Sequence, residues 1–293
     1  MTRFGPVLAA LTLLALALCR PLSAQENPYF VAYDHNLEEP GNLEVEYIST
    51  FATQRAGNDF LAHSIELEFG VNAWWTSEFY LDAQSTLEDS TLYTGFKWEN
   101  RFRVLKREHW INPVLYAEFA NTNGADKALK EVVGHDLESD STASNGEARR
   151  ERKREVEFKL ILSSNSRGWN FSENIVAEKS LSNAPWEFGY ALAASRPLAL
   201  KASARRCVFC RQNFIVGAEM YGGLGDRRSF GLRETSHYLA SLAGWNLPSG
   251  WTLRVSPGFG LNDNSHKFLL RWGVSREIKG FDRWLAQLFR TRS

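Results

Sequence analysis

Ile65-Glu-Leu-Glu-Phe-Gly-Val-Asn-Ala-Trp-Trp-Thr-Ser-Glu-Phe-Tyr-Leu-Asp-Ala-Gln84 contains two consecutive segments in which apolar and polar residues alternate. Side chains of a β-strand point alternately to its two faces, so each segment has one apolar and one polar face. Two strands of about ten residues, joined by a short turn with Trp74 and Trp75 at its edge, are typical of a transmembrane β-hairpin. A hairpin of a soluble β-sandwich would show the same alternation. The rest of the chain is needed to distinguish a membrane barrel from a soluble sandwich.

The start of the chain, residues 1–24, has the features of a secretory signal peptide. Arg3 precedes an apolar run over 7–19, and the small residue Ala24 ends the segment as a cleavage site requires. A lipoprotein signal ending at Cys19 is the alternative, but the preceding Leu16-Ala17-Leu18 has Leu where a small residue is needed. Later residues contain no apolar stretch of about 20 residues, so a membrane-spanning structure would have to be a closed barrel.

The composition argues against a nucleic-acid-binding protein and fits a membrane barrel. The chain has 34 Lys and Arg and 34 Asp and Glu, and this balance argues against nucleic acid as a partner. The ten tryptophans fit the aromatic girdles of a membrane barrel. The mean hydropathy of −0.34 fits as well, because only every second residue of a barrel strand faces lipid.

The alternation recurs down the chain and predicts an all-β fold, an antiparallel transmembrane β-barrel of about 12 strands in the outer membrane of a Gram-negative-type bacterium. The barrel is expected over 42–278, after an irregular periplasmic segment over 25–41. An even strand count places the long charged segment 122–153 outside the cell as a solvated loop. The connection 196–211 is long for the periplasmic side, where barrel turns are short.

Residues 279–293 are predicted to form an amphipathic helix, because Phe281, Trp284, Leu285, Leu288 and Phe289 repeat at helical spacing. This helix could lie on the inner leaflet, cap the barrel mouth or pack on a soluble domain.

The polar faces of the strands predict a charged lumen. Opposite charges on neighbouring strands indicate a constricted lumen crossed by ion pairs, with Glu44 and Glu46 near Lys267 or Arg271 and with weak charge selectivity. A Glu-x-Glu pair could also serve a glycosidase, but three such pairs on separate strands fit a lining better than one active site. The predicted lining residues are Glu44, Glu46, Glu66, Glu68, Glu78, Asp82, Lys97, Arg101, Arg103, Glu155, Glu157, Arg254, Lys267 and Arg271.

The remaining reactive residues indicate no enzyme, cofactor or metal site. Cys207 and Cys210 are predicted to form a disulfide in an oxidising compartment, because no histidine follows them for haem attachment. The six histidines are scattered, and the chain has no nucleophile elbow or phosphate-binding glycine loop.

The hairpin quoted above, from Ile65 to Leu81, resembles a motif of outer-membrane transporters of the phenol-degradation MetA-pathway type. The resemblance implies a barrel that passes small hydrophobic or aromatic molecules, and it transfers no functional residue. The leading hypothesis is therefore a pore or transporter for a small solute. The alternatives are a structural or surface-interaction barrel with a plugged lumen and, third, a membrane-embedded hydrolase. The expected partners are outer-membrane lipid and the solute.

Overall fold

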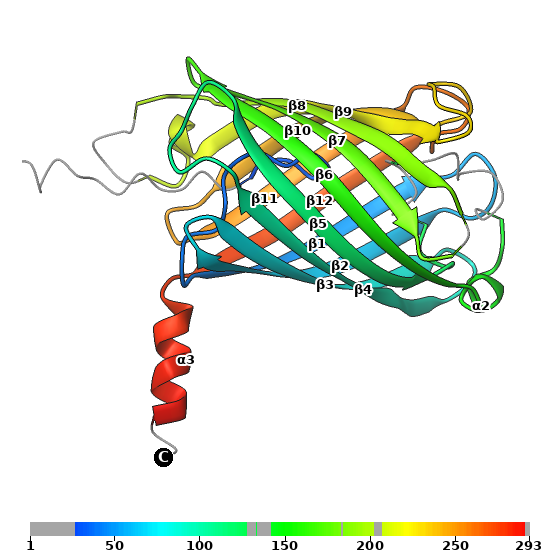
Figure 1. Cartoon of the computed structure of the whole chain (residues 1–293), viewed down its shortest axis with the longest axis horizontal. Coiled ribbons are helices and arrows are strands. Elements are labelled where there is room, and N and C mark those ends of the chain that lie inside the picture. The colour runs from blue at the N-terminus through cyan, green and yellow to red at the C-terminus, as the bar shows by residue number, and fades with distance from the viewer. Residues whose placement is uncertain (1–26, 128–132, 134–141, 183, 202–206, 291–293) are drawn as a thin grey trace, which may run out of the picture.

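The computed structural model describes residues 27–127, 133, 142–182, 184–201 and 207–290, so the expected signal peptide lies outside the described residues. Twelve strands form one antiparallel sheet that closes on itself (Figure 1), which confirms the predicted fold class. They are β1 (Leu43–Thr53), β2 (Phe60–Asn72), β3 (Trp75–Thr86), β4 (Thr91–Arg103), β5 (Asn112–Asn123), β6 (Arg152–Ser166), β7 (Trp169–Ser180), β8 (Trp186–Pro197), β9 (Phe214–Asp226), β10 (His237–Asn246), β11 (Trp251–Gly260) and β12 (Phe268–Ile278).

Each strand pairs with its neighbours in sequence, and β1 pairs with β12 to close the barrel. The closing register runs from Leu43 opposite Ile278 to Thr53 opposite Phe268. A closed sheet leaves no edge with unpaired backbone groups, which is the condition for strands to span lipid. Among the described residues, no helix is both long and apolar enough to cross a membrane.

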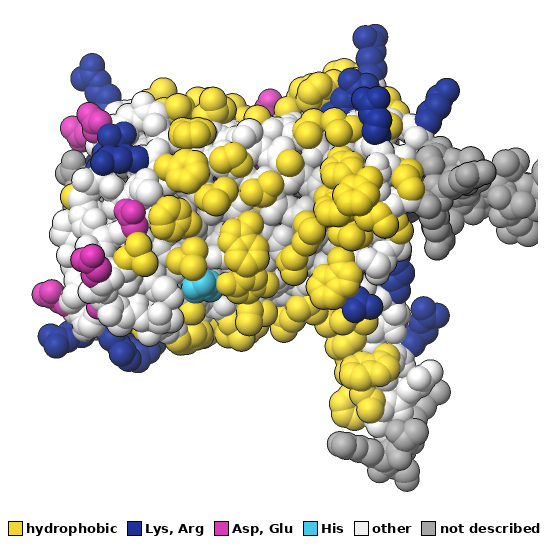
Figure 2. Space-filling view, turned by 180° about the vertical axis from the view of Figure 1, so that it is seen from behind, with side chains coloured by type: hydrophobic (Ala, Val, Ile, Leu, Met, Phe, Trp, Pro, Cys, Tyr) yellow, Lys and Arg dark blue, Asp and Glu magenta, His cyan; other side chains and the backbone are white. Residues whose placement is uncertain are grey.

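The alternation of the sequence becomes the inside and outside of the barrel. On β2, Leu67 is 37% exposed on the outer surface, whereas its neighbour Glu66 is 8% exposed and faces the lumen. Outward side chains of this kind form an apolar belt around the barrel, and Figure 2 shows one face of it. The belt matches the apolar band of a transmembrane barrel, and the polar side chains are gathered inside.

An arginine in the belt should destabilise the barrel in lipid. Leu67→Arg is expected to lower the free energy of unfolding by about 2–4 kcal/mol, because a charge near mid-membrane loses its hydration. Leu87→Arg is the matched control, since Leu87 is also exposed but lies in the loop after β3. Urea unfolding in lipid vesicles would measure both variants, and equal losses would contradict a lipid-facing position for Leu67.

The two ends of the barrel differ. At the end that carries Asn42 and Ile278, here called the terminal rim, the turns after β2, β6 and β10 have two to four residues. The connection 198–213 is longer, and it contains the 3-10 helix η2 (Arg211–Asn213) and a disulfide between Cys207 and Cys210. In this connection Phe209 stacks on Trp245 of β10 at a centroid distance of 5.0 Å. The opposite end, the loop rim, carries the segment between β5 and β6, which includes α2 (Asn145–Ala148).

The C-terminal helix α3 (Phe281–Arg290) starts directly at the terminal rim. The backbone N–H of Gly280 donates to Asn42 Oδ1 at 2.8 Å, and that of Asp282 donates to the Gly41 carbonyl at 3.1 Å. The helix projects away from the barrel, with its axis across the barrel axis (Figure 1) and hydrophobic side chains on the side toward the apolar belt (Figure 2). Trp284 is 54% exposed and Phe289 is 72% exposed. Its placement on the inner leaflet stays a prediction.

The N-terminal segment, described from residue 27 to 41, contradicts the expected periplasmic location. It is irregular as predicted, but it runs inside the barrel, where Tyr29 and Ala32 belong to a buried cluster with Tyr221 and Tyr238. The sequence shows no alternation here, so the pattern could not indicate where the segment lies. The polar lumen attracts it because its backbone N–H and C=O groups need hydrogen-bond partners.

The expected solvated loop over 122–153 is also wrong in part. Residues 122 and 123 complete β5, and 152 and 153 begin β6. Within the loop, Lys127 and Asn145 are buried, and the Lys127 backbone N–H donates to Gln84 Oε1 at 2.9 Å. Val133 pairs with Gly189 of β8 and lines the lumen. Hydrogen bonds to inward side chains therefore draw these residues into the barrel, despite a composition that favours solvent.

Candidate functional site: the acidic lumen

A cavity of about 260 Å³ lies inside the barrel. Its wall consists of inward side chains of several strands, among them β1 to β6, together with residues of the N-terminal segment. Twelve of the fourteen lining residues predicted from the sequence are on this wall: Glu44, Glu46, Glu66, Glu68, Glu78, Asp82, Lys97, Arg101, Glu155, Glu157, Arg254 and Arg271.

The other two lie elsewhere. Arg103 is at the terminal rim, where its Nη2 donates to the His35 carbonyl of the N-terminal segment at 3.1 Å. Lys267 precedes β12 and is exposed at the loop rim, so its assignment to the lumen is wrong. The alternation was extended one residue beyond the strand, where the backbone no longer follows the period of two.

The cavity wall is strongly acidic. It carries twelve carboxyl groups against six Lys and Arg side chains, a formal charge of −6. The charged residues that were not selected from the sequence are Glu99, Glu118, Asp126, Lys153, Lys159 and Glu178. Five of these six are on the inward face of their strands, so the same alternation could have identified them. Asp126 lies in the loop after β5, where no pattern applies.

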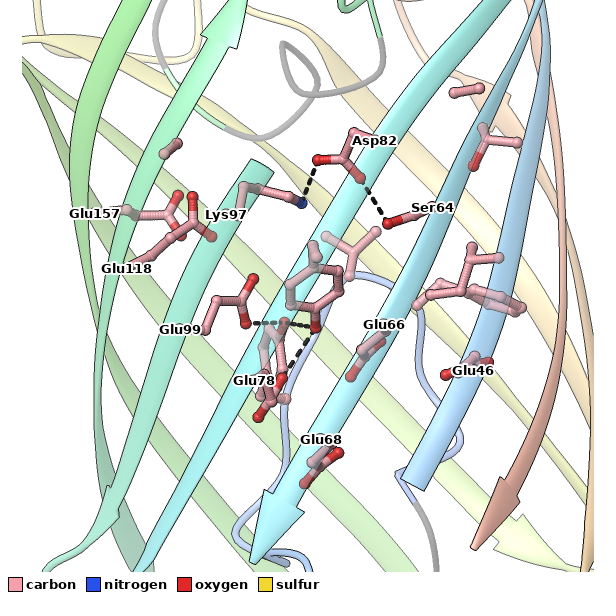
Figure 3. A pocket seen from close by; sticks show the side chains of 18 of the residues that line it. Glu46, Ser64, Glu66, Glu68, Glu78, Asp82, Lys97, Glu99, Glu118 and Glu157 are labelled. Atoms are coloured by element: carbon pink, nitrogen blue, oxygen red, sulfur yellow. Dashed lines mark hydrogen bonds and ion pairs between the residues drawn. The ribbon is translucent and has the colours of Figure 1, made fainter. Parts of the chain in front are cut away.

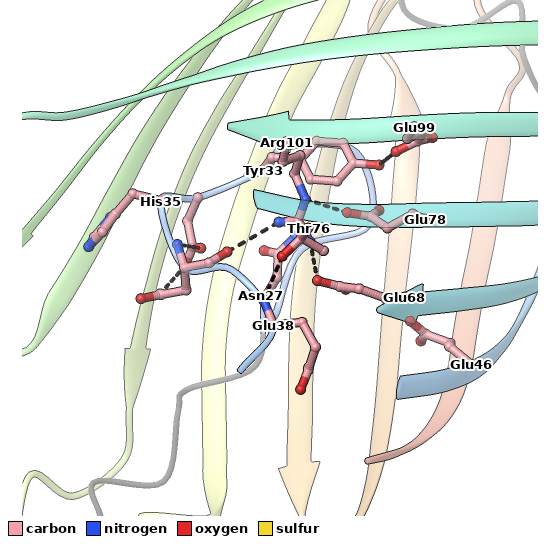
Figure 4. Close-up of polar contacts among 12 residues, drawn as sticks. Asn27, Tyr33, His35, Glu38, Glu46, Glu68, Thr76, Glu78, Glu99 and Arg101 are labelled. Atoms are coloured by element: carbon pink, nitrogen blue, oxygen red, sulfur yellow. Dashed lines mark hydrogen bonds and ion pairs between the residues drawn. The ribbon is translucent and has the colours of Figure 1, made fainter. Parts of the chain in front are cut away.

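Arg101 is the main cation of the lumen, and it is only 2% exposed. Its guanidinium forms ion pairs with Glu68 and Glu78, and its Nη1 donates to the Asn36 carbonyl at 3.2 Å (Figure 4). These contacts connect three elements, β2, β3 and the N-terminal segment. Such charge-assisted hydrogen bonds in a partly desolvated site hold the segment against the wall.

Glu66 lies beside this arrangement but has no cation of its own. Carboxylate oxygens of Glu66, Glu68 and Glu78 are all within 4.8 Å of one another, a spacing that could hold a metal ion. Arg101 already forms ion pairs with Glu68 and Glu78, and its one positive charge offsets one of their two negative charges. Glu66 makes no hydrogen bond or ion pair with any residue that the structure describes.

Two lysines, Lys97 (Figure 3) and Lys159, lie among the carboxylates of the cavity wall. Lys97 Nζ is 4.0 Å from Asp82 Oδ2 and 4.6 Å from the centre of the Tyr80 ring. Lys159 Nζ is 2.9 Å from Glu157 Oε1 and lies over the Tyr116 ring at 4.2 Å. These ring contacts show that a positive charge in this cavity is stabilised by aromatic faces as well as by carboxylates.

The expected pairing of Glu44 and Glu46 with Lys267 or Arg271 is wrong. Glu46 forms an ion pair with Arg254 of β11, two strands away across the closure. Arg271 instead bonds the Tyr221 hydroxyl of β9. In the register, Glu46 lies opposite Ser275 and not opposite Arg271, which faces Thr50. The sequence gives the neighbouring strands but not the register, and a shift of four residues changes every partner.

Glu219 of β9 is the functional residue that the sequence reasoning missed most clearly. It is 1% exposed, and its carboxylate accepts the backbone N–H groups of Phe30, Val31 and Ala32, the last two at 2.9 Å. Arg254 adds bonds to the Asn27 and Tyr29 carbonyls at 2.6 and 2.7 Å. Successive N–H groups around one carboxylate form a compact anchor.

The aromatic side chains of the segment reach further strands. The Tyr29 hydroxyl donates to Asn170 Oδ1 at 2.8 Å and forms a second hydrogen bond with Ser195 Oγ at 2.9 Å. The Tyr33 hydroxyl donates to Glu99 at 2.8 Å (Figure 4). Together with a contact between His35 and Ser163 of β6, residues 27–38 are bound to β3, β4, β6, β7, β8, β9 and β11, and they obstruct the lumen.

One serine and histidine contact bears on the hydrolase hypothesis. Ser163 Oγ is 2.9 Å from His35 Nδ1, and His35 Nε2 is 3.7 Å from Glu108 Oε1. A catalytic serine must meet its substrate. Ser163 is 2% exposed and neither it nor His35 lines the cavity, so this contact holds the N-terminal segment in place.

His266, in the loop between β11 and β12, predicts a loss of stability in acid. Burial lowers the pKa of His266 to about 4. A hydrogen bond with the Lys127 backbone raises this pKa, and the nearby positive charges of Arg271 and Lys127 lower it further. The unfolded chain binds more protons below its pKa of 6.5, so stability is complete above that pH and falls toward pH 4.

Between pH 7 and pH 5, this residue should cost about 2 kcal/mol of unfolding free energy, at 1.4 kcal/mol per pKa unit. Urea unfolding at both pH values measures the change, and His266→Gln, which does not titrate, should lose correspondingly less. An identical pH dependence of the two proteins would show that His266 has the same pKa in the folded and in the unfolded chain.

Comparison with known proteins identifies the fold only. Neither a protein-family model nor a curated protein matches the chain. The COG4313 outer membrane channel from Pseudomonas putida F1 is similar in structure, with a TM-score of 0.56 and 11% identity over 85% of this chain and 100% of that one. The NanC porin has a TM-score of 0.49 and 10% identity, over 80% of this chain and 100% of its own. The KdgM porin has a TM-score of 0.45 and 8% identity, over 80% and 98%. The structural neighbours are thus outer-membrane barrel proteins, and the MetA-pathway type is not among the findings.

Proposed function

We propose that the protein is an outer-membrane channel for small cationic solutes, whose N-terminal segment partly closes the lumen. The observation that carries this proposal is the closed barrel with a cavity wall of formal charge −6. Rings of acidic side chains select cations in a pore. The similar fold of a known outer-membrane channel fits the proposal. The terminal rim then faces the periplasm, and the loop rim faces the outside of the cell.

The lining narrows the class of solute. Besides carboxylates, the cavity presents the aromatic rings of Tyr29, Phe30, Tyr33 and Tyr80. A small organic cation that carries an aromatic or apolar group would meet both kinds of side chain. This choice reconciles the acidic wall with the hydrophobic or aromatic solutes that the MetA-type resemblance implies.

Charge selectivity in planar bilayers tests the proposal. Because the acids outnumber the bases two to one, we now expect preference for cations in place of the weak selectivity inferred from a balanced lumen. The reversal potential in a potassium chloride gradient should show cation preference, and Glu66→Gln/Glu118→Gln should reduce it. Glu173→Gln is the control, because Glu173 lies on the outer face of β7. Anion preference in the unmodified protein would contradict the proposal.

The N-terminal segment favours a second candidate, a structural or surface-interaction barrel with a plugged lumen. Its bonds to seven strands would be expected of a permanent plug. The same bilayer experiment separates the two, since a permanently plugged barrel carries no current with or without a solute.

A further inference from the structure

A row of cations lies on the outer surface of the barrel, at the loop rim of β6, β7, β8 and β9. These four strands are adjacent in the sheet (Figure 1). On β6, Arg152 and Arg154 share the outward face with Phe158, which is 48% exposed in the apolar belt. Arg227 and Arg228 follow β9 and line a surface pocket together with Lys179 and Trp186.

Backbone hydrogen bonds make the row continuous. The N–H of Leu181 donates to the Arg154 carbonyl at 2.8 Å, and the N–H of Arg227 donates to the Trp186 carbonyl at 2.9 Å. Lys179 fixes the loop between these points, because its Nζ donates to the carbonyls of Ser180, Ser182 and Ala184. All three N–H groups of the Lys179 ammonium are therefore bonded within the protein. The N–H groups of the arginine side chains are the donors that could bind a ligand.

The four arginines lack protein partners. All of them are exposed, and none of their guanidinium groups forms an ion pair or hydrogen bond with a residue that the structure describes. Apolar surface adjoins the row, since Phe230 is 68% exposed and packs on Phe188 at a centroid distance of 5.8 Å. Unpaired positive charge directly beside an apolar belt matches a lipid that has anionic headgroups and apolar chains.

We propose that Arg152, Arg154, Arg227 and Arg228 bind the phosphate groups of a phosphorylated glycolipid in the outer leaflet. The planar guanidinium forms two parallel hydrogen bonds with a phosphate, and two arginine pairs on one row suit a headgroup with two phosphates. The acyl chains lie along the belt beside Phe158 and Phe230, and Trp186 sits at the boundary, as tryptophans do in barrel girdles. The inference rests on the outer-membrane location in the proposed function, but not on conduction.

Lipid retention by the full-length protein tests the proposal. Protein in a neutral detergent is mixed with lipid A that carries both phosphates, or with lipid A from which the phosphates have been removed, and bound lipid is measured by native mass spectrometry. Arg154→Gln/Arg227→Gln should lower retention of the phosphorylated form by roughly tenfold or more, since two of the four phosphate-binding guanidinium groups are removed. The control is Arg107→Gln/Arg283→Gln, which removes two exposed arginines at the terminal rim.

Mobility of unheated samples on a gel first verifies that both variants are folded. The proposal is supported if the native protein retains the phosphorylated form more strongly, if inorganic phosphate does not displace that lipid, and if only the loop-rim variant loses it. Equal retention of both lipids would overturn it, as would equal losses in the two variants. Displacement by inorganic phosphate at matched concentration would also overturn it, because the site would then bind free anions. A cation-selective channel without lipid preference would refute this inference alone, and lipid preference without conduction would refute only the proposed function.

Discussion

Replacing residues 28–38 with a glycine and serine segment of equal length should raise the single-channel conductance severalfold. The native segment obstructs the lumen by its bulk and by its bonds to inward side chains, including the three N–H groups held by Glu219. A segment without aromatic side chains cannot make the Tyr29 and Tyr33 contacts. The barrel should still form, because its strand ladders do not include these residues.

A point variant tests the same mechanism without changing the segment itself. Glu219→Ala removes the acceptor of three backbone N–H groups and should produce a smaller rise in conductance with more frequent gating. Glu173→Ala is matched to it, because it removes a carboxylate from the outer face of the barrel. Conductance that stays at the native value in the replaced-segment protein would show that residues 28–38 do not limit the current.

The alternation of side chains predicts the barrel well because one physical condition controls it. A strand between lipid and a polar lumen must alternate, so strand number and the lumen face of Glu66 or Arg101 can be deduced from sequence. The pattern fails where that condition ends. Lys267 directly precedes β12, so the alternation no longer applies to it, and it is exposed at the loop rim.

Partners across the barrel are harder to predict than faces. Arg254 pairs with Glu46 because the register places them near each other, and register depends on turns that the pattern does not define. The N-terminal segment shows a further limit. Its backbone is held by Glu219 from a strand almost 190 residues later, and no local feature of residues 27–38 indicates such a contact.

The second large effect is expected at Arg101. Arg101→Met should lower the free energy of unfolding by about 3–5 kcal/mol, the usual consequence of removing one partner from a buried ion pair. Arg101 is 2% exposed and is the cation that pairs with both Glu68 and Glu78, so its loss leaves two carboxylates without an ion-pair partner beside Glu66. Urea unfolding in lipid vesicles would measure the change.

Two further variants distinguish lost charge balance from lost packing around Arg101. Arg101→Met/Glu68→Gln/Glu78→Gln removes the carboxylates as well as the cation and should recover most of the lost stability, because amides are neutral and can still bond one another. Arg276→Met is the control, since Arg276 is exposed on the outside over the Trp251 ring and should cost about 1 kcal/mol or less. If the triple variant were no more stable than Arg101→Met, packing of the arginine stem would be the dominant contribution, and the electrostatic account of the lumen would be wrong.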